Sequence, residues 1–261
     1  MNLDLKGKNA LVGGSSRGIG KASAMELAAL GANVTLISRS AEIMADVLKE
    51  LDNSQGQQHD FLVVDYSDYK SVKKQIKAYL TNKNIHILIN NTGGPPGGPI
   101  TEAKVKQFLQ AFNNHLICNH LATKYAIKGM KADGYGRIIN IISTSVKAPL
   151  HGLGVSNTTR GAVASWAKTM ANELGQFGIT VNNVLPGATN TSRLQEIIVN
   201  KANKTGTSEE EVANKMKSAI PMQRFATPAE VGAAVAFLAS PAAAYINGIN
   251  LPVDGGRTSC L

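Results

Sequence analysis

Cysteine and long apolar runs are scarce in this chain of 261 residues. The two cysteines are Cys118, in a segment that predicts a helix, and Cys260, next to the last residue. This spacing indicates neither a disulfide framework nor a metal site, so we interpret both as reduced thiols. No apolar stretch is long enough to cross a bilayer, and Met1 to Lys8 lacks the apolar core of a signal peptide. We therefore expect a cytoplasmic protein with no membrane partner and no bound metal.

Acidic residues are outnumbered by basic ones. The 27 Lys and Arg against 18 Asp and Glu leave a formal charge of +9. The basic residues are spread along the chain, and no basic cluster with interleaved aromatic residues stands out, so we expect no nucleic-acid partner. The surplus positive charge can still attract phosphorylated cofactors or anionic substrates, an effect that salt weakens.

Linkers and repeats are also missing, and we therefore expect one domain over residues 1–261. Seven short runs that are apolar almost throughout alternate with helical segments. Such strands are typical of a parallel sheet covered by helices on both faces, so the sequence predicts an α/β, doubly wound, mostly parallel, Rossmann-like sheet in a three-layer αβα arrangement. The expected strands are Asn9 to Val12, Asn33 to Ile37, His59 to Val64, Ile85 to Asn90, Arg137 to Ile142, Thr180 to Leu185 and Gly248 to Val253.

A glycine-rich turn lies between the first expected strand and a helical run from Ile19 to Leu30. It places glycine at 13, 14, 18 and 20, a G-x-x-x-G-x-G spacing in place of the common G-x-G-x-x-G. Glycine lets backbone amides approach an anion, and the following helix presents free N–H groups and a positive dipole end. The turn predicts a cradle for the phosphates of a nucleotide.

Polar residues also follow the other strands. Because ligands of such sheets bind beyond the carboxyl ends of the strands, we expect these residues to line one crevice. They are Ser38 and Arg39, Asp65, Asn90 to Gly93, Ser143, and Pro186 to Thr191.

From about Leu5 to Gly256 the chain resembles the short-chain dehydrogenase/reductase family. The matching segments are Gly14, Gly18, Ile19 and Gly20; Asp65; Asn90 to Gly93, where the family usually has Asn-Asn-Ala-Gly; Arg137 to Ser143; Asn182 with Pro186 and Gly187; and two late segments at 224–231 and 253–256.

This resemblance implies a nicotinamide dinucleotide cofactor. Asp65 would hydrogen-bond the adenine, Asn91 and Gly93 would line the adenosine side, and Thr191 would reach the nicotinamide amide. The full set of expected cofactor residues is Gly14, Ser16, Arg17, Gly18, Ile19, Gly20, Ser38, Arg39, Asp65, Asn91, Thr92, Gly93, Arg160, Pro186, Gly187, Thr189 and Thr191.

The residues after the second strand favour NADP(H) over NAD(H). A carboxylate there would bind a free ribose 2′-hydroxyl, but the chain has Ser38 and Arg39, with Arg17 in the facing turn. Two guanidinium groups can hold a 2′-phosphate through charge-assisted hydrogen bonds. The alternative is that both arginines only face solvent.

The catalytic positions depart from the family pattern. Most members have a serine, a tyrosine thirteen residues later and a lysine four beyond that; here the three positions hold Ser143, Ser156 and Arg160. A helper asparagine of the family falls on His115. An aliphatic hydroxyl ionises far less readily than a phenol, and a guanidinium holds its proton, so neither replacement is a direct acid or base.

Three proton carriers therefore stay open: His115, His151, or a water held by Ser143, Ser156 and His115. None of the six tyrosines lies between Ser143 and Thr191, and Tyr135 is expected at the wrong edge of the sheet.

Three functions remain. The first is an NADP-dependent oxidoreductase that moves a hydride between nicotinamide and a carbonyl or alcohol, with a 3-oxoacyl-like substrate as one expectation from similar reductases. The second is a noncatalytic NADP-binding sensor or partner subunit. The third is a lyase of the halohydrin-dehalogenase type, which resembles the family and has arginine at the lysine position.

Two regions bear on substrate and assembly. Residues 188–222 are expected to form a variable flap over the site, the alternative being an ordinary pair of surface helices. The resemblance implies a homo-oligomer, dimer or tetramer, built on the helices at Val105 to Lys131 and Ser156 to Phe177, although their apolar residues could equally pack against the sheet.

Overall fold

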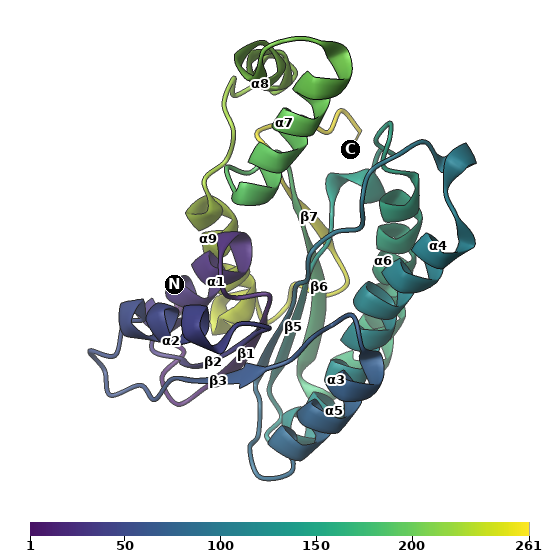
Figure 1. Cartoon of the computed structure of the whole chain (residues 1–261). Coiled ribbons are helices and arrows are strands. Elements are labelled where there is room, and N and C mark those ends of the chain that lie inside the picture. Colours follow the sequence, from purple (N-terminus) through teal and green to yellow (C-terminus); the bar gives the residue numbers. More distant parts are fainter. Residues whose placement is uncertain (261) are drawn as a thin grey trace.

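A computed structural model describes residues 1–260 and contains one parallel sheet of seven strands. The strand order across the sheet is β3-β2-β1-β4-β5-β6-β7, which places a reversal of winding between β1 and β4 (Figure 1). Ligands of doubly wound sheets bind at such a switch point. The strands are β1 Asn9–Gly13, β2 Asn33–Ser38, β3 Asp60–Val63, β4 Ile87–Asn90, β5 Gly136–Ile141, β6 Ile179–Pro186 and β7 Asn250–Val253.

Helices cover both faces of the sheet. One layer holds α1 (Gly18–Ala29), α2 (Ala41–Glu50) and α9 (Pro228–Ala239), and the other holds α3 (Tyr69–Leu80), α4 (Val105–Phe112), α5 (Cys118–Ala132) and α6 (Gly154–Leu174). Two further helices, α7 (Ser192–Thr205) and α8 (Glu209–Ser218), stand beyond the sheet at the top of Figure 1.

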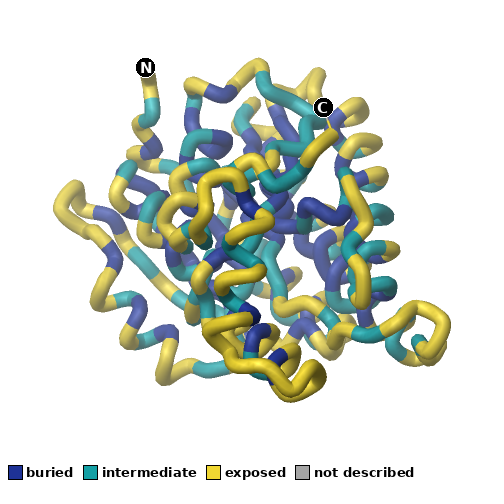
Figure 2. The backbone as a smooth tube through the Cα atoms, turned by 90° about the horizontal axis from the view of Figure 1, so that it is seen from above, coloured by how far each residue is buried: buried dark blue, intermediate teal, exposed yellow. Residues whose placement is uncertain are grey.

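The core follows from the apolar strands. Their alternate side chains feed two clusters, one against α1 and α9 and one against α3, α5 and α6. In the view from above in Figure 2, exposed segments surround this buried centre. Burial on both faces explains why the strands carry no polar alternation, and the predicted fold class is confirmed.

The strand predictions agree with the structure to within about two residues at each end. The long helix expected from Val105 to Lys131 differs in one detail. Residues Asn113–Ile117 form a π-helical turn between α4 and α5, so the helix is locally widened at His115. Such turns are frequent at functional sites.

Four asparagines form a row of side-chain hydrogen bonds, here called the asparagine ladder, across strands β4, β5, β6 and β7. Asn90 donates to Asn140 at 2.9 Å, Asn140 to Asn183 at 2.9 Å, and Asn183 to Asn250 at 2.8 Å. These residues are direct neighbours in the strand register, which brings one amide to the next across β4, β5, β6 and β7. The ladder pairs the amide groups inside the sheet, except for Oδ1 of Asn90, which has no partner within residues 1–260, and it links the strands β4 to β7.

No helix within residues 1–260 is long and apolar enough to span a membrane.

Candidate functional site

The glycine turn is packed too closely to accept side chains. A Cβ at Gly20 would lie 2.2 Å from the carbonyl oxygen of Gly14 and 2.7 Å from Nδ2 of Asn91. Gly14 and Gly18 both have φ of +58°, a left-handed conformation that glycine adopts without strain. The spacing of the glycines thus reflects a turn in which backbone, not side chains, forms the surface.

Asn91 holds this turn from the neighbouring strand. Its Nδ2 donates to the carbonyl oxygen of Gly13 at 3.1 Å and of Gly14 at 3.4 Å. Across the turn, a Cβ at Gly18 would lie 3.3 Å from Cγ2 of Thr191. Residues from the ends of β1, β4 and β6 therefore converge, as the sequence predicts.

The amino end of α1 is left open beside the turn. Its N-cap residue Arg17 makes no capping hydrogen bond, and its first turn has no acidic residue. By contrast, α9 begins with a reciprocal cap between Thr227 and Glu230. An uncapped N-terminus behind a glycine cradle fits the phosphates of a dinucleotide, since its free amides and dipole attract an anion.

The second and third strands end beside each other at the adenosine side. Ser38 ends β2, and exposed Arg39 lies close enough to Asp65 to contribute to the lowered pKa of this carboxyl, whose main cause is the backbone amide of Ser67. Within residues 1–260 neither Arg17 nor Arg39 forms an ion pair. Both guanidinium groups are therefore available to a ligand phosphate.

The carboxyl end of β6 forms the opposite side of the crevice. Pro186 ends the strand, and Gly187 has Asp254 so close that a Cβ would lie 2.7 Å from the aspartate Cα. Thr189 pairs with Ala226, and Thr191 caps α7 through Leu194 N at 3.3 Å. Of the remaining predicted cofactor residues, Ser16, Thr92 and Ile19, the last in α1, are half-buried, and Gly93 is exposed.

The predicted catalytic serines lie on two different elements. Ser143 follows β5, and its Oγ accepts the backbone N–H of Ser145 at 3.1 Å, which leaves the hydroxyl proton free to be donated. Ser156 lies in the first turn of α6 and is half-buried. Its hydroxyl has no hydrogen-bond partner among the described residues.

Arg160 follows one turn later in α6 and is 7% exposed. Its Nη1 donates to the carbonyl oxygen of Ile141 at 3.0 Å, and a Cβ at Gly94 would lie 3.9 Å from its Nη2. Burial lowers the pKa of Arg160 to about 10, so the side chain still carries its charge at neutral pH. The guanidinium thus lies between the end of β5 and the loop after β4.

His115 lies in the π-helical turn and is 1% exposed. Burial, together with the nearby charge of Arg160, holds the pKa of His115 well below its usual value. Its Nδ1 has no hydrogen-bond partner. The imidazole is therefore neutral at pH 7, and it lies beside the catalytic positions rather than in solvent.

His151 is placed differently. It lies in an exposed turn ahead of α6, with no hydrogen bond to another described residue. The next residue, Gly152, accepts the N–H of Gly98 at 2.7 Å, so this turn is joined to the Pro95 to Pro99 segment. Tyr135 lies at the amino end of β5, where its hydroxyl donates to Ala239 O at 2.7 Å, and its predicted position at the wrong edge is confirmed.

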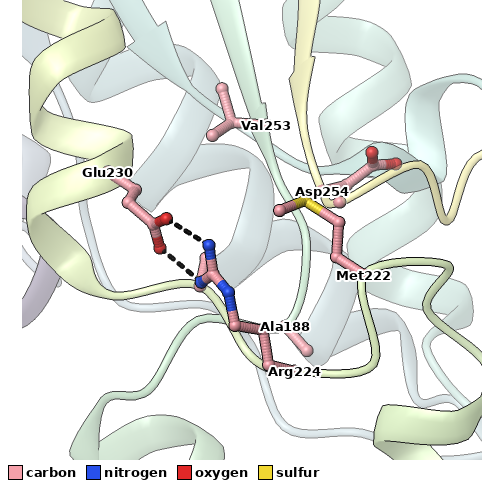
Figure 3. A pocket seen from close by; sticks show the side chains of 8 residues that line it. Ala188, Met222, Arg224, Glu230, Val253 and Asp254 are labelled. Atoms are coloured by element: carbon pink, nitrogen blue, oxygen red, sulfur yellow. Dashed lines mark hydrogen bonds and ion pairs between the residues drawn. The ribbon is translucent and has the colours of Figure 1, made fainter.

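A small hollow of about 100 Å³ lies next to the crevice (Figure 3). Ala188, Met222, Val253 and Asp254 line it, together with an ion pair between Arg224 and Glu230 that has N–O distances of 2.8 and 2.6 Å. None of the predicted catalytic residues faces it. The ion pair and the α9 cap use the polar groups of this hollow, so we regard it as a packing gap beneath the α7–α8 segment.

Two features of the site lack a signal in the sequence. Tyr66 is buried below the glycine turn, where a Cβ at Gly13 would lie 2.9 Å from its hydroxyl. The π-helical turn at His115 is the other. A tyrosine after an aspartate and a histidine inside a helical run are both common in sequences, so only packing reveals these placements.

Comparisons with known proteins agree with this geometry. Residues 14–258 match a family model described as enoyl-(acyl carrier protein) reductase. The chain is 35% identical over 251 residues to the granaticin polyketide synthase putative ketoacyl reductase 1 of Streptomyces violaceoruber, covering 95% of this chain and 92% of that protein. It is 34% identical over 261 residues to the 3-oxoacyl-[acyl-carrier-protein] reductase FabG of Vibrio cholerae, covering 97% and 98%.

Among solved structures, L-sorbose reductase from Gluconobacter frateurii, complexed with NADPH and L-sorbose, superimposes with a TM-score of 0.93. The sequence identity is 27%, and the match covers 100% of both chains. The fold and the site thus define a dinucleotide-binding α/β protein. The chain belongs to the short-chain dehydrogenase/reductase family, and the predicted family is confirmed.

Proposed function

We propose that this protein is an NADP(H)-dependent oxidoreductase that interconverts a carbonyl and an alcohol. The main support is the glycine turn, which Asn91 holds in front of the uncapped N-terminus of α1 and which fits the phosphates of the cofactor. When bound, the cofactor supplies or accepts a hydride. The sorbose reductase complexed with NADPH supports the cofactor by analogy.

The preference for NADP(H) rests on Arg17 and Arg39. Both arginines are exposed and form no ion pair within residues 1–260, and they flank the point where an adenosine ribose would lie. Asp65 binds the adenine, and Thr191 binds the nicotinamide amide. The cofactor would lie across the switch point from α1 to α7.

In the catalytic centre, Ser143 donates a hydrogen bond from its free hydroxyl to the substrate oxygen and so polarises the carbonyl. Ser156, whose hydroxyl has no hydrogen-bond partner within residues 1–260, holds a water molecule that relays the proton between the substrate oxygen and bulk water. His115 is neutral and buried, so it cannot act as the acid at pH 7, and its inaccessible Nδ1 cannot bind the water; it contributes through its packing beside Arg160. His151, which is exposed, is left out of this scheme.

The α7–α8 segment serves as the substrate flap of one NADP-binding domain. Arg193 of α7 donates to Pro95 O at 3.3 Å, so the flap touches the Pro95 to Pro99 segment across the crevice. A 3-oxoacyl-like substrate finds support in the FabG and ketoacyl reductase relatives.

Assembly as a homo-oligomer, dimer or tetramer, finds support on α4. Val105 and Leu109 are 74% and 62% exposed there. Ala126 is instead buried against the sheet, and Trp166 and Met170 pack against the same core, so these residues serve the fold. Light scattering at micromolar concentration tests the assembly, and a monomer would contradict it.

Two measurements on the purified protein test the proposal. Calorimetry should detect NADPH binding that is tighter than NADH binding. Absorbance at 340 nm should fall when NADPH and a panel of ketones and 3-oxoacyl thioesters are added. The rate should change little between pH 6 and 9, because the proposed proton carrier is a water molecule and not a titrating side chain. The double variant S156Y/R160K restores a phenol and a lysine and should introduce a titrating limb into that profile.

The alternatives give different results. Tight NADPH binding with no turnover in wild type, but turnover in S156Y/R160K, would identify a noncatalytic cofactor-binding protein. Halide release from a haloalcohol without nucleotide would identify a lyase. Absence of NADPH binding would overturn the proposal as a whole.

A further inference from the structure

The catalytic centre contains a buried positive charge that no protein group balances. Within residues 1–260 no carboxylate forms an ion pair with Arg160, and burial alone accounts for its shifted pKa. The adjacent histidine is neutral. A buried, unpaired charge is strongly unfavourable, so a fold that keeps one generally uses it to bind a ligand.

The guanidinium also has hydrogen-bond donors to spare. The guanidinium has five N–H groups, and within residues 1–260 one of them, on Nη1, donates to a protein acceptor, the carbonyl oxygen of Ile141. The ribose of a bound cofactor offers neutral hydroxyls, which can accept hydrogen bonds but cannot balance the charge. The N–H groups of a guanidinium lie in one plane, so it can donate two parallel hydrogen bonds to the two oxygens of a carboxylate.

Serine in place of the family's tyrosine leaves a path for a ligand from the crevice to the guanidinium of Arg160. Ser156 is one helical turn before Arg160, and its short side chain has no protein partner, so no phenol ring separates the guanidinium from the crevice. Ser143 lies two residues after Ile141, whose carbonyl anchors the guanidinium. Two residues of extended chain span roughly 7 Å, so the arginine and the serine hydroxyl can reach neighbouring groups of one small molecule.

We propose that the substrate is a 2-oxo or 3-oxo acid, whose free carboxylate is bound by Arg160 while Ser143 binds the keto oxygen. This inference rests on the proposed oxidoreductase function and narrows its substrate class to free oxo acids, which replaces the 3-oxoacyl thioesters suggested by the relatives. It assigns Arg160 to substrate selection, a task separate from contact with the cofactor.

The test measures binding in the presence of saturating NADP+, which cannot donate a hydride, so no turnover interferes. Probes are 2-oxo acids with aliphatic and aromatic side chains, 3-oxobutanoate, and the methyl ester of each acid. By calorimetry or thermal shift, the wild-type protein should bind at least one acid about 10-fold or more tightly than its ester, the ratio that one ion-paired hydrogen bond provides. This comparison needs no variant and is independent of any folding defect.

Two variants then locate the effect. R160M should bind the acid and its ester equally, and R160K should retain part of the preference because it keeps the charge but loses the planar donors. NADPH affinity is measured separately for each variant, and circular dichroism confirms that each is folded.

Other outcomes would contradict the oxo-acid proposal. If cofactor-loaded wild type binds no acid in the panel, binds acids and esters alike, or keeps its preference in R160M, the oxo-acid proposal is wrong. If R160M weakens only NADPH binding, Arg160 serves the cofactor alone and the proposal is again wrong. Failure of wild type to bind NADPH would instead overturn the proposed function itself.

Discussion

The imidazole of His115 lies beside the guanidinium of Arg160 in the interior, and burial together with this cation keeps the histidine neutral. The two residues come from different elements of the same helix layer, the π-helical turn before α5 and the first half of α6. This relationship makes the stability of the protein sensitive to acid.

We expect H115N to remove part of that sensitivity. His115 binds a proton near pH 6.5 when the chain is unfolded but only at much lower pH when folded, so its contribution is complete above pH 6.5 and is lost as the pH falls. Between pH 7.5 and 5.5 the wild-type chain should lose about 1 kcal/mol more unfolding free energy than H115N. Urea denaturation at both pH values measures this difference.

His86, whose pKa is also lowered mainly by burial, is present in both proteins and cancels in the comparison. Equal losses in wild type and H115N would mean that His115 is accessible to protons in the folded state.

Removal of Arg39 should change cofactor choice. In R39A, NADPH should bind about 10- to 100-fold more weakly, the cost of a charge-assisted hydrogen bond, while NADH affinity stays nearly constant because NADH has no 2′-phosphate. Calorimetry with both cofactors measures the ratio. The control K49A removes an exposed cation on α2 that pairs with Asp46, and it should leave both affinities unchanged. Parallel losses for NADPH and NADH in R39A would argue against a 2′-phosphate contact.

An added methyl group should disable the cradle at Gly20, whereas the same change at Gly161 in α6 should not affect it. G20A would force a Cβ to within 2.2 Å of Gly14 O, so the turn must open, at a cost of about 1–3 kcal/mol in stability and most of the NADPH affinity. Gly161 in α6 has no atom within 4 Å of its ideal Cβ, and G161A should stabilise the protein by up to about 1 kcal/mol. Thermal denaturation and NADPH titration measure both effects. Unchanged NADPH binding by G20A would contradict the cradle.

The asparagine ladder should be most sensitive at its centre. In N140L, Asn90 loses an acceptor and Asn183 loses a donor inside the sheet, which should cost about 2 kcal/mol or more. N250L affects only the last, half-buried link with Asn183 and should cost less. Chemical denaturation measures both variants, and a smaller loss in N140L than in N250L would show that the ladder is not a continuous stabilising network.

The sequence by itself determined the seven strands, the parallel sheet and the glycine turn, because these depend on local patterns. Apolar runs without alternation require a sheet covered on both faces, and glycine at 14, 18 and 20 marks a turn that side chains would obstruct. The crevice followed from topology, because the carboxyl ends of parallel strands lie at one edge.

Only the tertiary structure decided how the site is held and charged. Asn91 closes the turn of a strand that lies 78 residues earlier, and the asparagine amides meet because of strand register. His115 and Arg160 become neighbours because a π-helical turn and the rotation of α6 aim both side chains inward. Strand register and helix rotation are set by packing over the whole core, so no local pattern contains them.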